Sequence, residues 1–162
     1  MVLNKKRIKV GISIGDVNGI GPEIILKCFS DLRMFDSCTP IVYGSNSVLL
    51  HYGNSMKINV DNLNVLNDKF EPQANKINIC EIKDDLVKVQ EGVQSISSGK
   101  FSFLALEKAV QDIASNKVDV LVTAPIDKFS ISQSGFKFQG HTEYLANYAN
   151  EEYEENGHDL KS

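Results

Sequence analysis

The sequence lacks the features typical of a membrane protein, a secreted protein or a nucleic-acid-binding protein. No apolar run approaches the roughly 20 residues that a membrane-spanning helix needs, and no apolar segment follows the charged N-terminus as it would in a secretory signal. Basic residues are not in excess, since the 162-residue chain has 17 Lys and Arg against 21 Asp and Glu. We therefore expect no membrane partner and no nucleic-acid partner.

Cysteine is scarce and scattered. The three cysteines, Cys28, Cys38 and Cys80, form no C-x-x-C pair, which argues against a zinc knuckle and against a disulfide framework. Cys28 lies within an apolar helical pattern, so we expect it to be a small core residue. Cysteine usage of this kind fits a reducing compartment, and we expect a cytoplasmic protein. The sequence contains no internal repeat and no low-complexity segment, and its length favours one domain.

Apolar patterns predict strands that alternate with helices. Strands are predicted where apolar residues are β-branched or alternate, at 7–14, 40–44, 76–82 and 118–124. Helices are predicted where apolar residues recur at helical spacing, at 22–33, 45–53 and 101–116, and a further helix is expected to begin near His141. This order favours an α/β doubly wound, mostly parallel sheet, in which ligands bind at the carboxyl ends of the strands.

Individual residues add detail to the predicted strands and helices. The nearly continuous apolar run at 118–124 is typical of a central parallel strand that is covered on both faces. Pro22 suits the first turn of a helix, Glu23 favours its positive end, and Gly53 is a candidate stop for the helix at 45–53. The segment 54–76 predicts loops and one short strand, whereas 83–100 has no clear period and its "SISSGK" is interpreted as an ordered loop or the approach to a helix.

The glycine turn "GDVNGIGPE" follows the first predicted strand. Gly15 and Gly19 would allow positive φ angles and Gly21 would allow close packing of a helix on a strand. Alternatively, free N–H groups at the start of the helix would form an anion site. The turn matches neither the dinucleotide fingerprint nor the P-loop. Asp16 and Asn18 either bond their own backbone, as turn residues do, or line a cleft and orient a ligand.

Two further stretches, "TAPIDK" and "GHTE", carry candidate site residues. Lys128 is either a solvated lysine or a point charge for a phosphate or carboxylate group. His141 and Thr142 can both hydrogen-bond a polar substrate, although a lone histidine at a helix start can also bond locally. Glu143 is interpreted as a first-turn carboxylate that serves the helix dipole.

The stretches "VGISIGDVNGIGPEIILK", "VDVLVTAPIDK" and "FQGHTEYLAN" together resemble the 4-hydroxythreonine-4-phosphate dehydrogenase family of vitamin B6 biosynthesis. The usual family forms are G-D-P-x-G-I-G-P-E, T-A-P-I-N-K and F-P-G-H-T-E. The resemblance implies an α/β fold like that of isocitrate and isopropylmalate dehydrogenases. It also implies NAD-dependent oxidation of a phosphorylated alcohol, assisted by a divalent metal (Zn, Mg or Co), with decarboxylation to 3-amino-2-oxopropyl phosphate. His141 and Thr142 match the substrate-binding pair of the family, and a homodimer is implied.

The resemblance covers about half of a family member. We therefore expect residues 1–162 to be the N-terminal α/β portion of a longer two-domain dehydrogenase, truncated so that the C-terminal half is absent. The metal ligands and the phosphate-binding Lys, Asn and Arg of the family are expected beyond Ser162, and the chain alone is expected to be inactive. His158 comes too early for a metal ligand and lies in an acidic tail that is expected to be solvated.

Three departures from the family pattern leave the substrate open. Val17 stands where the family usually has proline, Asp127 replaces asparagine, and Gln139 replaces the proline before "GHTE". A relative that oxidises another phosphorylated hydroxy acid is one alternative. A non-catalytic α/β module that binds a phosphorylated ligand is another. An acyl-phosphate-handling transferase of related fold is a third, which the "GHTE" motif disfavours.

Overall fold

The computed structural model describes residues 7–83 and 87–155, which form a five-stranded, all-parallel sheet with the strand order β3-β4-β2-β1-β5. The strands are β1 (Ile8–Ser13), β2 (Cys38–Gly44), β3 (Leu63–Val65), β4 (Ile77–Glu81) and β5 (Val120–Thr123). The helices are α1 (Gly21–Phe29), α2 (Met34–Ser37), α3 (Asn46–Met56), α4 (Ile96–Ala114), α5 (Lys128–Gln133) and α6 (His141–Glu155).

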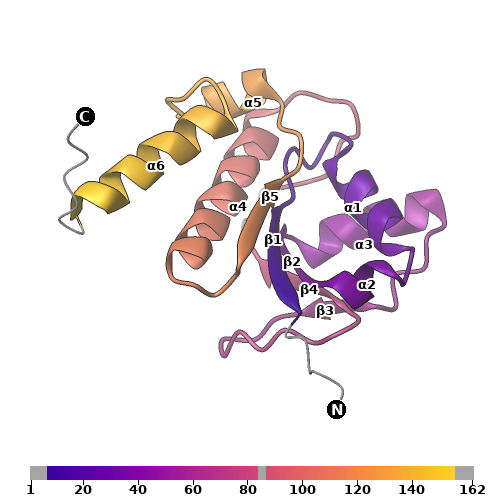
Figure 1. The fold of residues 1–162 in the computed structure, drawn as a ribbon. Coiled ribbons are helices and arrows are strands. Elements are labelled where there is room, and N and C mark those ends of the chain that lie inside the picture. Colours follow the sequence, from indigo (N-terminus) through magenta and orange to yellow (C-terminus); the bar gives the residue numbers. More distant parts are fainter. Residues whose placement is uncertain (1–6, 84–86, 156–162) are drawn as a thin grey trace, which may run out of the picture.

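Helices cover both faces of the sheet, which confirms the predicted doubly wound α/β class. The long helix α4 lies along one face, α1 and α3 lie against the other, and α6 extends away from the body beside α4 and α5 (Figure 1). The fully buried Ile14, Ile41, Ile79 and Leu49 belong to one continuous core that joins the sheet to its helices. Such continuous burial on both sides explains why the strands are β-branched and apolar.

Strand β1 lies at the point where the order of the strands reverses. It pairs with β2 on one side, where Ile12 faces Val42, and with β5 on the other, where Ile12 faces Val122. The chain moves from β1 to β2 and β4 in one direction, and returns through α4 to β5 in the other. The turn after β1 and the loop after β5 therefore leave the sheet side by side, at the position where open α/β sheets bind ligands.

The prediction that the strand at 118–124 is central and covered on both faces is wrong for the described chain. β5 is an edge strand that pairs only with β1, and the exposed fractions of Val120 and Val122 are 43% and 50%. A β-branched run reflects a preference for extended backbone, which an edge strand and a central strand share. The run therefore indicates a strand but does not determine its place in the sheet.

The helix predicted at 22–33 is shorter than expected, and the prediction for Cys28 is wrong. α1 ends at Phe29, so Leu32 falls in the following turn and is exposed. Cys28 is also exposed, because the buried side of α1 runs through Ile25, Leu26 and Phe29. Pro22 and Glu23 do occupy the first turn, as predicted.

Two helix boundaries also differ from the predictions. α3 continues through Gly53 to Met56 and ends at Lys57, whose φ is 56°. Gly53 is required for packing and is no helix stop, because a Cβ there would lie 2.4 Å from Val60 Cγ1. α4 begins at Ile96, earlier than the apolar period indicates, because the Ser95 side chain caps it by accepting from the Ser98 N–H. Capping extends a helix beyond its apolar stripe.

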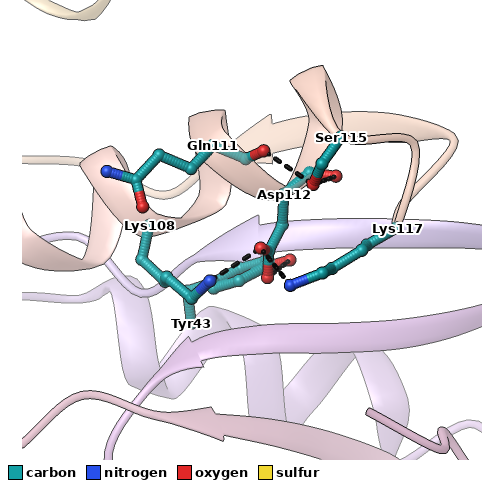
Figure 2. Close-up of polar contacts among 6 residues, drawn as sticks. All are labelled: Tyr43, Lys108, Gln111, Asp112, Ser115 and Lys117. Carbon is teal, nitrogen blue, oxygen red and sulfur yellow. Dashed lines mark hydrogen bonds and ion pairs between the residues drawn. The ribbon is translucent and has the colours of Figure 1, made fainter. Parts of the chain in front are cut away.

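A buried carboxylate joins α4 to the middle of the sheet (Figure 2). The side chain of Asp112 is 2% exposed and accepts a hydrogen bond of 3.0 Å from the Tyr43 hydroxyl of β2. Lys108 and Lys117 reach the same carboxylate, with Nζ–Oδ1 distances of 2.7 and 3.2 Å. Burial, together with the charge of Asp112, holds the pKa of Tyr43 far above its usual range. The tyrosine therefore stays protonated and serves as the donor.

In the part of the chain that the structure describes, no helix combines the length and the apolar character needed to cross a bilayer.

We expect the Asp112→Ala substitution to lower the free energy of unfolding by about 2–4 kcal/mol, because it leaves the buried Tyr43 hydroxyl without an acceptor and removes the partner of two lysines. Lys117→Ala should cost less than about 1 kcal/mol, because the lysine side chain is 45% exposed. Urea unfolding followed by circular dichroism measures both values. Equal losses in the two variants would contradict the role given to the Tyr43 hydrogen bond.

Candidate functional site

The glycine turn, residues 15–19 after β1, is held by hydrogen bonds from three other parts of the fold. The Asp16 N–H donates to the Pro125 carbonyl after β5 at 2.9 Å. The Ser102 hydroxyl of α4 donates to the Gly15 carbonyl at 2.7 Å. From α3, the Tyr52 hydroxyl is shared between the carbonyls of Val17 and Gly19, at 2.9 and 3.0 Å. Burial, as the main cause, raises the pKa of Tyr52 to about 12, so this donor keeps its proton at neutral pH.

Gly15 in the turn and Gly21 at the start of α1 are two positions where a Cβ would clash with backbone. Gly15 has a φ of 74°, and a Cβ there would lie 2.2 Å from the Pro125 carbonyl oxygen. At Gly21 a Cβ would lie 2.3 Å from the Ile14 carbonyl oxygen, which confirms the predicted close packing of helix on strand. The prediction of a positive φ is confirmed for Gly15 and is wrong for Gly19. The turn is therefore fitted against its neighbours and is not merely flexible.

An open hollow of about 610 Å³ lies beside this turn. Its lining comes from three segments that are distant in sequence, namely the glycine turn, the loop before α4 and the first residues after β5. The lining residues are Asp16, Asn18, Gly19, Gly92, Val93, Gln94 and Asp127. The structure thus brings together two of the predicted site residues, Asp16 and Asn18, with three residues from a segment to which the sequence assigned no role.

Asn18 ties the loop of residues 90–95, here called the 90–95 loop, to the glycine turn. Its Nδ2 donates to the Val93 carbonyl at 2.8 Å and to Ser95 Oγ at 3.4 Å, and its Oδ1 accepts from the Gln90 N–H at 2.8 Å. Its backbone carbonyl accepts from the Gly92 N–H at 2.7 Å. Asn18 is 2% exposed, so its side chain is engaged in holding the wall of the hollow.

The 90–95 loop has two further anchors, one on each side. His51 Nε2 of α3 lies 2.8 Å from Glu91 Oε1, which gives a structural role to a histidine for which the sequence predicted none. Gln94 Nε2 donates to Asp127 Oδ2 at 2.9 Å. Gly92 is the residue whose type could have indicated a turn here, and its φ of 75° is one that glycine adopts readily. The loop was missed because the contacts that order it come from residues far away in the chain.

Asp127 caps helix α5 on the far side of the hollow. Its Oδ1 accepts from the Ser130 N–H at 2.7 Å, and this bond is the main cause that lowers the pKa of Asp127 below its ordinary value. The carboxylate is therefore ionised at neutral pH. Asp127 therefore places a full negative charge beside the hollow.

The other predicted site residues begin the last two helices. Lys128 is the first residue of α5 and is exposed. His141 and Thr142 are the first two residues of α6; Thr142 is exposed and His141 is half-buried. These three residues are not among those that line the hollow. Their role as a substrate-binding set stays a prediction.

His141 has an unusual environment among the described residues. Its Nε2 atom is buried and has no hydrogen-bond partner within the described chain. Burial lowers the pKa of His141 below the ordinary value of 6.5, so the imidazole is neutral at pH 7. A neutral imidazole with a free nitrogen can donate to or accept from a polar ligand, depending on its tautomer.

Within residues 7–83 and 87–155 there is no group of three or more His, Cys, Asp and Glu side chains that could hold a metal ion. His158, which the sequence analysis considered as a metal ligand and set aside, lies outside the described residues.

Comparison with known proteins identifies a family and several relatives. Residues 36–156 match the family described as pyridoxal phosphate biosynthetic protein PdxA. A 4-hydroxythreonine-4-phosphate dehydrogenase of Bacteroides thetaiotaomicron is 38% identical over 143 residues, which is 88% of this chain and 39% of that protein. A putative D-threonate 4-phosphate dehydrogenase of Clostridium botulinum is 31% identical over 156 residues, which is 93% of this chain and 46% of that protein.

A solved structure of a protein with the same name as these relatives has a similar fold. The crystal structure of a 4-hydroxythreonine-4-phosphate dehydrogenase from Burkholderia phymatum superimposes with a TM-score of 0.81 at 26% identity, covering 90% of this chain and 44% of that one. The chain thus spans about two fifths of the length of the relatives that it matches.

We expect Gly15→Ala to be more destabilising than Gly92→Ala, although the two glycines have φ angles of 74° and 75°. The positive φ alone should cost about 1–2 kcal/mol in each variant. Nothing lies within 4 Å of a Cβ at Gly92, whereas at Gly15 the clash with Pro125 should add about 1–3 kcal/mol. Chemical denaturation of both variants measures the difference. A similar loss in both would show that the contact between Gly15 and the Pro125 loop is not tight.

We expect NMR titration of the imidazole signals to give His141 a pKa below 6.5, because burial penalises the imidazolium form. The stability linked to the neutral ring is fully present above the unfolded-state value of about 6.5 and is lost as the pH falls through the lowered folded-state value. His141→Asn should therefore lose less stability than the wild type between about pH 7 and pH 5. An unshifted or raised pKa would contradict the buried position of the ring.

Proposed function

Because the chain belongs to the family described as pyridoxal phosphate biosynthetic protein PdxA, we propose that it forms the N-terminal α/β part of a 4-hydroxythreonine-4-phosphate dehydrogenase. The observation that carries the proposal is the match to the family over residues 36–156, together with relatives of that name. The chain covers 39% of the length of the Bacteroides thetaiotaomicron relative, so the activity belongs to a protein longer than the described residues.

The reaction that we propose is the oxidation of the secondary alcohol of 4-hydroxythreonine 4-phosphate. NAD, when bound, would supply the acceptor for the hydride, and the alcohol proton would pass to solvent as the ketone forms. The ketone then stands β to a carboxylate, and carbon dioxide is lost to leave 3-amino-2-oxopropyl phosphate. The switch point between β1 and β5 supports this assignment, because it is where a doubly wound sheet presents loops to a ligand.

The roles that we propose for the residues of this chain are binding and orientation. His141, which is neutral and has a free ring nitrogen, and Thr142, which is exposed, are suited to hydrogen-bond the substrate. Lys128 is exposed at the start of α5 and supplies a positive charge for a phosphate or carboxylate group. Asp16 faces the hollow at the glycine turn, and Asn18 shapes that hollow.

The described residues do not fit a metal ion, so no step of the reaction is assigned to a metal here. We propose that the ligands of a Zn, Mg or Co ion in the longer protein lie beyond Ser162. We also propose a homodimer in the cytoplasm, which is supported by the resemblance to the family and by the cysteine usage.

A second candidate substrate is D-threonate 4-phosphate. The Clostridium botulinum relative named for that substrate aligns over 93% of this chain. The departures at Val17, Asp127 and Gln139 lie in the same motifs as the candidate site residues. An enzyme with a different substrate is expected to differ from the family pattern in such motifs. A non-catalytic module that binds a phosphorylated ligand is the remaining alternative for the isolated chain.

The test is an assay of NADH formation by a protein that joins this chain to the C-terminal portion found in its relatives, with 4-hydroxythreonine 4-phosphate, NAD and a divalent metal. We expect turnover, and a loss of about 10- to 100-fold in kcat/KM for His141→Asn, because a hydrogen bond to a charged substrate is worth about 1.5–3 kcal/mol. D-Threonate 4-phosphate in parallel decides between the two substrates.

Ser134→Ala is the control for that assay, since among the described residues its hydroxyl bonds only the Ile131 carbonyl at the end of α5. It should leave kcat/KM unchanged. Absence of NADH with both substrates would refute the enzyme assignment, and binding of either substrate without turnover would favour the non-catalytic module.

A further inference from the structure

We propose that Gln94 is a positioning residue, which acts through Asp127 to fix the start of helix α5 and therefore the place of Lys128 beside the glycine turn. The role of Lys128 as a contact for a phosphate or carboxylate group comes from the proposed function, which this inference deepens. The link between Gln94 and α5 is measurable without any enzyme activity.

Hydrogen bonds join the segments around the hollow into a closed ring. The Asp16 N–H of the glycine turn donates to the Pro125 carbonyl after β5. Two residues further on, Asp127 Oδ2 accepts from Gln94 Nε2. Asn18 then ties the loop that carries Gln94 back to the glycine turn. The side chain of Gln94 is exposed, so a substitution there opens the ring on one side and leaves the contacts of Asn18 and Pro125 in place.

Helix α5 is held against α4 at its third residue, Ser130. The Ser130 Oγ atom accepts from the Ser95 N–H at 3.2 Å, and a Cβ at Gly99 of α4 would lie 2.0 Å from the Ser130 carbonyl oxygen. This contact fixes the place where the two helices cross. The bond from Gln94 reaches a different point of α5, the capping residue Asp127, and restrains the direction of the first turn.

Asp127 passes this restraint to the residue that follows it. Its Oδ1 accepts from the Ser130 N–H at 2.7 Å and its Oδ2 accepts from Gln94 at 2.9 Å, so one planar carboxylate joins the loop to the helix. Hydrogen bonds to an ionised acceptor are stronger than those between neutral groups. Lys128 comes next, is exposed, and takes part in none of the ion pairs among the described residues. Its reach is therefore set by the backbone of the capped turn.

The first test measures the link between Gln94 and Asp127 by NMR of the 162-residue chain. Gln94→Glu places two carboxyl groups together, so the introduced group should have a pKa above the ordinary value of about 4.3. Adding Asp127→Asn supplies an amide donor to the introduced carboxylate and keeps an acceptor for the Ser130 N–H, so the pKa should fall below about 4.3. Asp16 and Lys128 are the same in both variants, so the difference reports the partner at position 127.

The amide signals of the same chain report the position of the start of α5. Gln94→Ala removes the link without adding a charge, and it should shift the amide signals of Lys128 and Phe129. Gln94→Glu combined with Asp127→Asn, here called the reversed pair, rebuilds the hydrogen bond with donor and acceptor exchanged. It should return these signals close to their wild-type positions.

The second test uses the joined protein of the enzyme assay. Gln94→Ala should raise KM about 3- to 10-fold with little change in kcat, because Lys128 contributes equally to the binding of substrate and transition state. The reversed pair should restore KM to within about twofold of the wild type. In a Lys128→Ala background, Gln94→Ala should cause no further rise in KM, because the charge that Gln94 positions is gone.

Gln133→Ala is the matched control, since it makes the same change at an exposed residue at the other end of α5. It should leave KM and the amide signals of Lys128 and Phe129 unchanged. Thermal melting verifies that every variant is folded.

The proposal is overturned if the introduced carboxyl group has the same pKa with and without Asp127→Asn, or if the reversed pair restores neither the amide signals nor KM. It is also overturned if Gln94→Ala raises KM equally in the presence and absence of Lys128, because Gln94 would then act by another route. If the joined protein turns over neither substrate, the proposed function fails, while the pKa comparison and the amide signals still confirm or refute the positioning of α5 by Gln94.

Discussion

The contact between the glycine turn and the Pro125 carbonyl is the constraint on which the candidate site depends. The Asp16 N–H donates to that carbonyl at 2.9 Å, and a Cβ at Gly15 would lie 2.2 Å from the same oxygen. The turn after β1 and the loop after β5 are thus in direct contact across the switch point of the sheet. Because the two loops are fitted to each other, Asp16 and Asp127 take fixed positions on either side of one hollow.

Helix α4 connects this site to the body of the fold. Near its start, Ser102 donates to the Gly15 carbonyl, and the Ser95 cap continues directly into the 90–95 loop. Near its end, Asp112 is tied to Tyr43 in the neighbouring strand β2. Helix α4 is thus anchored at both ends, to the glycine turn through Ser102 and to the sheet through Asp112.

Local patterns in the sequence predicted most of the helices and strands but not the residues that pack against them. The alternation of strands and helices, Pro22 in the first turn of α1 and the role of Gly15 were all predictable, because each depends on neighbours in the chain. The edge position of β5 and the exposure of Cys28 depend on what packs against them, which a local period does not reveal. The 90–95 loop is the extreme case, since Asn18 and Gln90 are joined across 72 residues.

The charge of the hollow bears on how a phosphorylated substrate would lie against this chain. Asp16 and Asp127 place two carboxyl groups at the hollow, and exposed Lys128 directly follows Asp127 in the chain. Opposite charges at the two ends of a bound molecule fix its orientation, and orientation is what a hydride transfer needs most from the protein.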